Sequence, residues 1–71
     1  MKTVKSEVTG TVWKVVATEG QAVAEGDVLV IVESMKMEIP VEATAAGVLR
    51  ELRVSEGSVI SEGDPIGVIG Q

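Results

Sequence analysis

The sequence lacks the residues on which many small domains depend for catalysis and cross-linking. Its 71 residues include no cysteine and no histidine, so neither a Ser-His nor a Cys-His nucleophilic system can be built. Disulfides and metals held by cysteine or histidine, which stabilise many domains of this size, are excluded as well. No D-x-D-x-D-G loop provides a carboxylate site for calcium. We therefore expect a protein that does not catalyse a reaction on its own and binds no metal.

Charge and aromatic content weigh against nucleic acid and membranes as partners. Eleven acidic residues against six basic ones give a net charge of −5, whereas a phosphate backbone is bound through clustered lysine and arginine. Trp13 is the only aromatic residue, so bases have no stacking platform. The longest apolar run, from Val28 to Val32, is far too short to cross a bilayer, and the first residues lack the apolar core of a signal peptide. Together with the missing cysteine, these features predict a soluble cytoplasmic protein.

The chain contains an internal repeat. The segment GTVWKVVATEGQAVAEGDVLVIV begins at Gly10, and GVLRELRVSEGSVISEGDPIGVI begins at Gly47, 37 positions later. Both segments carry a Glu-Gly and a Glu-Gly-Asp turn at matching places, and their aliphatic positions also coincide. We interpret them as two copies of one supersecondary unit, spanning about residues 10–33 and 47–70 of a single domain, 1–71, and related by an approximate two-fold axis.

Each copy has the composition of strands separated by turns. Short runs rich in valine and isoleucine alternate with glycines, which is typical of β-strands and tight turns. Eight strands are predicted, at about 3–8, 11–18, 22–24, 28–33, 37–43, 48–55, 59–61 and 65–69. A sheet this small has to curl or stack to bury its aliphatic side chains. The predicted fold class is therefore all-β, a flattened barrel or a sandwich of two sheets.

Two irregularities refine the predicted strands. Val12 and Val15, which match apolar positions of the second copy, lie three residues apart, whereas side chains on one face of a strand recur every two. The second copy breaks the period in the same way, which indicates β-bulges near Trp13 and near Arg50. A bulge leaves Trp13 partly exposed, whereas a regular strand buries it in the core, and both interpretations stay open. Pro40 cannot donate to a ladder, so its strand is expected at a sheet edge or to be bulged.

The stretch ESMKME, at residues 33–38, lies between the two copies. It connects two predicted strands, so the chain has to reverse near residues 35–36. The Asn-Gly or Asp-Gly dipeptide that is typical of a tight hairpin is missing. A tight turn here puts Met35 and Lys36 in unfavourable backbone conformations, a form of strain that is often retained at functional sites.

On these motifs the chain resembles the biotin/lipoyl attachment domain family, in particular its biotinyl branch. The residues that carry the resemblance are MKM at 35–37, Glu33 before it, EIPVEA after it, Gly47 and the two EGxxxxEGD turns. The resemblance covers almost the whole chain. It implies a flattened barrel of two four-stranded antiparallel sheets with an internal two-fold repeat, in which a modified lysine projects from a hairpin far from both termini.

Departures from the family pattern indicate the kind of carrier. Ser34 stands where many members have alanine. The chain leaves no room between residues 16 and 23 for the thumb insertion of the enteric-type carriers, so it is more similar to the thumbless ones. The near-complete domain, beginning at Met1, suits a free-standing carrier and an excised domain equally.

The resemblance implies a carrier of carboxyl groups, with Lys36 in the place of the modified lysine. In the family, a biotin protein ligase joins biotin to that amine, a biotin carboxylase loads a carboxyl group, and a carboxyltransferase passes it to an acyl-CoA or a related acceptor. The residues expected to shape the hairpin and contact the ligase are Glu33, Ser34, Met35, Met37 and Glu38.

Two alternatives stay open for Lys36. The first is lipoate at the same amine, serving acyl transfer. Lipoyl domains usually have Asp-Lys-Ala there, so the two methionines argue against this alternative. The second is a β-barrel interaction module in which Lys36 is exposed but carries no modification.

Overall fold

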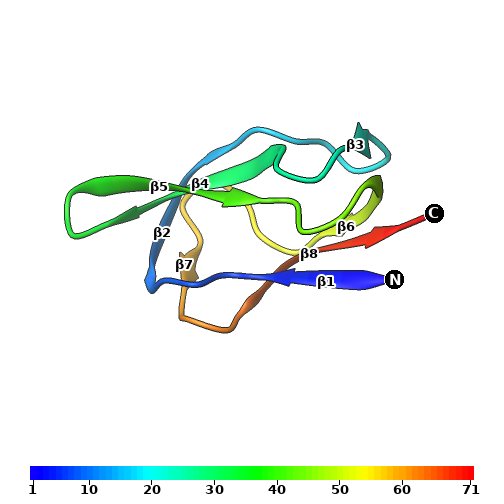
Figure 1. The fold of residues 1–71 in the computed structure, drawn as a ribbon. Coiled ribbons are helices and arrows are strands. Elements are labelled where there is room, and N and C mark those ends of the chain that lie inside the picture. Colours follow the sequence, from blue (N-terminus) through cyan, green and yellow to red (C-terminus); the bar gives the residue numbers. More distant parts are fainter.

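The computed structural model describes all residues from Met1 to Gln71 and consists of strands and turns (Figure 1). The eight strands are β1 (Lys2–Lys5), β2 (Gly10–Val15), β3 (Ala22–Val23), β4 (Val28–Ser34), β5 (Met37–Glu42), β6 (Gly47–Leu52), β7 (Val59–Ile60) and β8 (Pro65–Gly70). They form two four-stranded sheets, in the orders β1-β8-β6-β3 and β5-β4-β2-β7. Every pairing is antiparallel, which confirms the predicted fold class. The structure contains no helix of the length and apolarity that a membrane crossing requires.

The two sheets are equivalent, strand for strand. We call β1-β8-β6-β3 the terminal sheet and β5-β4-β2-β7 the hairpin sheet. The strands β6, β7 and β8 begin 37 positions after β2, β3 and β4, respectively, and are their equivalents. The backbone hydrogen bonds are reciprocal: Gly20 N donates to Leu49 O at 2.7 Å, and Gly57 N donates to Val12 O at 2.8 Å. Each Glu-Gly turn therefore closes against a strand of the other unit.

The equivalence also includes β1 and β5, which lie outside the residues that the repeat covers in the sequence. Gly63 N donates to Ser6 O at 2.8 Å, and Gly26 N donates to Ala43 O at 2.9 Å. Ser6 and Ala43 are 37 positions apart and both are buried. Each structural unit thus has four strands, β1–β4 in the first and β5–β8 in the second, and gives two strands to each sheet. The β4–β5 turn connects the two units.

Two glutamates add a side-chain contact of the same reciprocal kind. Oε2 of Glu19 accepts a hydrogen bond from Leu52 N at 2.8 Å, and Oε2 of Glu56 accepts one from Val15 N at 3.5 Å. Since both amides lie at the end of a strand, the carboxylates satisfy backbone donors that the ladder leaves unpaired. The shorter bond is expected to contribute more to stability.

The core lies between the two sheets and is made of aliphatic side chains. Thirteen residues form it: Val4, Val12, Ala17, Val23, Leu29, Val30, Val32, Val41, Ala43, Leu49, Ile60, Ile66 and Ile69. The one buried polar residue is Ser6, whose hydroxyl donates to Val8 O at 2.6 Å. No buried side-chain polar atom is left without a hydrogen-bond partner. This density of branched aliphatics compensates for the missing disulfides and metals.

Both predicted bulges are present. The register of β2 against β4 shifts between Val12 and Lys14, and that of β6 against β8 shifts between Leu49 and Glu51. Trp13 lies at the first shift and is 49% exposed, so it is not a core residue. Pro40 lies in β5, an edge strand of the hairpin sheet, where its missing N–H breaks no ladder bond, as predicted.

Three strands end three residues earlier than the sequence predicts. The strands predicted at 3–8, 11–18 and 48–55 stop at Lys5, Val15 and Leu52. At the end of β2, the amides of Val16 and Ala17 both donate to Leu29 O, so the chain leaves the regular ladder and turns inward. The aliphatic residues beyond the strand end, such as the buried Ala17, close the end of the barrel instead of extending the sheet.

Close approach of β2 and β4 explains the glycine that opens the first copy. A Cβ on Gly10 would overlap with the carbonyl oxygen of Glu33 and lie 2.9 Å from a methyl group of Val32. Gly47 opens the second copy and meets Gly70 and Ile69 in the same way. Glycine is required here because the backbones of neighbouring strands touch.

Candidate functional site

The β4–β5 hairpin has a strained two-residue turn. Ser34 pairs with Met37, and Met35 and Lys36 form the loop between them. Their φ angles are +51° and +65°, and they are the only residues other than glycine with positive φ. Positive φ at both central positions is characteristic of a type I′ turn, which normally selects asparagine, aspartate or glycine. The expected unfavourable backbone angles are confirmed, at a cost of about 1–2 kcal/mol per residue.

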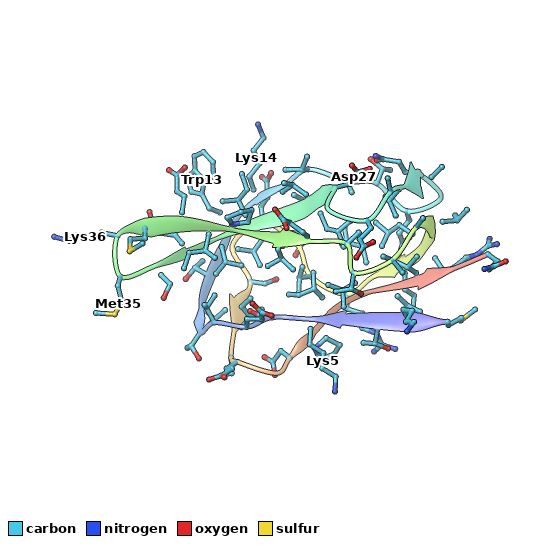
Figure 2. All side chains as sticks on the ribbon, in the orientation of Figure 1. Lys5, Trp13, Lys14, Asp27, Met35 and Lys36 are labelled. Carbon is cyan, nitrogen blue, oxygen red and sulfur yellow. The ribbon has the colours of Figure 1, made fainter.

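The turn carries Lys36 to one extreme of the molecule. The chain measures 34 × 19 × 18 Å, and the hairpin lies at the opposite end of the long axis from both termini (Figure 1). The Lys36 side chain points away from the barrel (Figure 2). It is exposed, and its amine makes no hydrogen bond and no ion pair within the chain. Lys36 is therefore accessible to an enzyme that approaches along the axis.

The two methionines beside Lys36 are outside the core. Met35 is 91% exposed and Met37 is 63% exposed. Apolar side chains this exposed gain little stability from burial. Packing within the fold therefore does not account for apolar side chains at both positions.

The remaining predicted residues lie on the arms of the hairpin. Glu33 on β4 and Glu38 on β5 form a directly opposed cross-strand pair, and both are exposed. Neither carboxylate has a cationic partner, because the single ion pair of the molecule joins Arg53 to Glu51. Like charges directly opposite one another destabilise a sheet. Ser34 is half-buried and closes the strand before the turn.

The site offers a nucleophile but no catalytic apparatus. A primary amine can form an amide with a carboxylic acid, yet a solvated lysine is protonated at neutral pH. No base lies within hydrogen-bonding distance of Lys36, and no group of acidic side chains is placed to hold a metal. The three surface hollows, of about 160, 190 and 320 Å³, do not include Lys36 in their walls. The site therefore presents an exposed amine that no pocket encloses.

Two exposed side chains, one directly after β2 and one on β7, were not singled out from the sequence. Val16 is 48% exposed and Val59 is 81% exposed. The repeat contains a signal that could have found one of them, because the second copy has Arg53 at the position of Val16. An aliphatic residue in one copy and a charged one in the other indicates a surface position.

Comparisons with known proteins identify the family. A family model described as biotin-requiring enzyme matches residues 2–69. The biotinylated protein TB7.3 homolog of Mycobacterium leprae is 52% identical over 66 residues, which cover 93% of each chain. The biotin-dependent acyl-coenzyme A carboxylase alpha3 subunit of the same organism is 48% identical over 54 residues, 76% of this chain and 9% of that protein. The Kluyveromyces lactis urea carboxylase structure matches with a TM-score of 0.92 and 38% identity, over 97% of this chain and 6% of that one. The chain therefore belongs to the biotin-requiring enzyme family, as its resemblance to the biotinyl domains predicted.

Proposed function

We propose that this protein is a biotin carboxyl carrier in which biotin is joined through an amide to Nζ of Lys36. One observation carries the assignment of the residue: Lys36 is the exposed, unpartnered lysine at the tip of the strained hairpin. The family and the biotinylated relative of nearly equal length support biotin as the attached group. When bound, biotin supplies the ring nitrogen that carries the carboxyl group.

The chain's own contribution is presentation and reach. Lys36 provides the amine that forms the amide, with loss of water, once a biotin protein ligase has removed its proton. The turn holds the base of the lysine side chain beyond the end of the barrel, so that the barrel does not obstruct an active site that encloses the tip. A tethered group is also supplied at high local concentration, which favours repeated visits to two enzymes.

The proposed partners are a biotin protein ligase, a biotin carboxylase and a carboxyltransferase that acts on an acyl-CoA or a related acceptor. The acyl-CoA carboxylase subunit among the relatives supports this acceptor class. The chain itself is a non-catalytic carrier, one attachment domain over residues 1–71, and works in the cytoplasm. Glu33, Ser34, Met35, Met37 and Glu38 form the surface that the ligase meets around Lys36.

Intact-mass measurement tests the proposal directly. The chain is co-expressed with a biotin protein ligase and a lipoate ligase, with both vitamins supplied. We expect a single biotinyl increment that disappears in Lys36→Arg and persists in Lys14→Arg, a matched control because Lys14 is also exposed. A lipoyl increment, no increment, or a biotinyl increment that survives Lys36→Arg contradicts the proposal.

A further inference from the structure

Exposed apolar side chains are concentrated on the hairpin sheet. The large hydrophobic residues with high exposure are Met1, Trp13, Val16, Met35, Met37 and Val59. Apart from Met1, each lies in the hairpin sheet, directly after one of its strands, or in its β4–β5 turn. Trp13 and Lys14 lie on the side of this sheet that faces away from the terminal sheet (Figure 2). The terminal sheet has no comparable group of exposed apolar side chains.

The internal repeat shows that folding does not require these side chains. The positions equivalent to Trp13 and Val16, 37 residues later, hold Arg50 and Arg53. Arg50 sits at a bulge of the same kind as Trp13, and both arginines are exposed. Arginine is thus accommodated at the equivalent positions in and directly after β6, beside the same type of bulge. The indole and the valine therefore serve a purpose other than stability.

The surroundings of Trp13 indicate the chemistry of a partner. Ile31 on β4 is half-exposed, and it is paired with the exposed Pro40 on β5. The exposed carboxylates Glu33, Glu38 and Glu42 flank them, and no ion pair neutralises these acids. Lys14, paired with Ile31 across β2 and β4, adds one positive charge, so the acids remain in excess. An apolar centre with unpaired acidic side chains at its border complements a cationic surface that contains an apolar pocket. Tryptophan is the residue type most often found as the anchor of such contacts.

We infer that this outer face of the hairpin sheet, anchored by Trp13 and Val16, is the surface by which a biotin protein ligase docks. The inference rests on the proposed function of Lys36. The unmodified chain exposes Lys14 as well as Lys36, and no pocket surrounds either amine, so selection of Lys36 has to use the folded surface next to the hairpin. β4 and β5 are the arms of that hairpin, so the outer face continues directly into the turn. The ligase is expected to present lysine or arginine side chains around a pocket for the indole.

The test uses each copy of the repeat as the control for the other. Biotinylation rates are measured with one bacterial ligase for the wild type, Trp13→Arg, Val16→Arg and Arg50→Trp. The two changes on the hairpin sheet introduce the residues that the second copy already carries, and Arg50→Trp makes the reverse change on the terminal sheet. We expect Trp13→Arg to raise KM at least about tenfold with kcat unchanged, Val16→Arg to raise KM less, and Arg50→Trp to leave both constants unchanged.

Further outcomes separate docking from folding and from the proposed function. Thermal unfolding followed by circular dichroism should give similar midpoints for the wild type and Trp13→Arg, and the KM of the wild type should rise with ionic strength. Three results overturn the docking surface while leaving Lys36 as the attachment site. They are an unchanged KM in both Trp13→Arg and Val16→Arg, a rise in the KM of Arg50→Trp equal to that of Trp13→Arg, or a fall in kcat with no change in KM. A wild type that no ligase modifies overturns the proposed function itself.

Discussion

The two methionines that flank Lys36 should respond to glycine substitution with opposite signs. Met35 occupies the first central position of the turn, with φ at +51°, whereas Met37 is the first residue of β5 and pairs with Ser34. Glycine adopts positive φ without steric cost, but within a strand it loses more conformational entropy than other residues. The two changes delete the same side chain two residues apart, so they compare a position with positive φ and a strand position.

The expected magnitudes follow from φ and exposure. Met35→Gly removes a left-handed penalty of about 1–2 kcal/mol and adds about 0.5–1 kcal/mol of glycine entropy, for a net stabilisation of about 0.5–1 kcal/mol. Its side chain is 91% exposed, so little burial is lost. Met37 is 63% exposed and loses its partial burial and strand propensity together, for a destabilisation of about 1 kcal/mol. In a domain of this size, about 1 kcal/mol corresponds to roughly 4–8 °C in Tm.

Thermal and urea unfolding of the unmodified chain provide the measurement. Met35→Ala is the control for side-chain loss, because alanine keeps the strain, and we expect it to change Tm little. If Met35→Gly is no more stable than Met35→Ala, the left-handed conformation carries no cost and the reasoning about strain is wrong. If Met37→Gly is also stabilising, the register of β5 at the turn is wrong.

Further substitutions test the contacts that hold the barrel together, with urea unfolding as the assay throughout. Glu19→Ala should cost about 1 kcal/mol and Glu56→Ala no more than about 0.5, because the carboxylate bonds measure 2.8 and 3.5 Å; equal costs would contradict the difference between them. Gly10→Ala should cost about 2–3 kcal/mol, because the new Cβ pushes β2 away from β4. Gly20→Ala should cost only about 1 kcal/mol for its φ of +90°, because its Cβ meets nothing within 4 Å. A larger cost for Gly20→Ala than for Gly10→Ala would refute the close approach of β2 and β4. Leu29→Ala, at a position with 0% exposure, should cost about 2–5 kcal/mol, a large part of the roughly 4–10 kcal/mol expected for the whole domain; a loss below about 1 kcal/mol would place Leu29 outside the core.

Much of the fold could be predicted because the sequence contains an internal repeat, so that each pattern occurs twice. A single strand with apolar residues three apart can be dismissed as irregular, but Val12 and Val15 share their spacing with Leu49 and Leu52. A shared irregularity indicates a shared backbone feature, and the structure contains both bulges. The hairpin was predicted from its position between two strands rather than from turn residues, since its turn lacks the usual ones.

Other features depend on how the two units meet, which no local pattern encodes. The extra length of the predicted strands came from aliphatic residues such as Ala17 that close the barrel end after leaving the ladder. The carboxylate contacts of Glu19 and Glu56 join residues 33 and 41 positions apart, so Glu-Gly could be identified only as a turn signal. The equivalence of β1 and β5 was missed because the matching positions are few, chiefly Val4 with Val41 and a buried Ser6 with a buried Ala43.

The repeat also separates what the fold requires from what a partner requires. Core positions exchange one aliphatic residue for another between the copies, as in Val23 and Ile60 or Leu29 and Ile66, because burial is the only demand on them. An exchange of tryptophan for arginine between Trp13 and Arg50 cannot be explained in this way, since both positions are exposed beside a bulge. The exposed apolar residues therefore lie on the sheet that carries Lys36. Contact with a partner that recognises this lysine is the simplest explanation for their place.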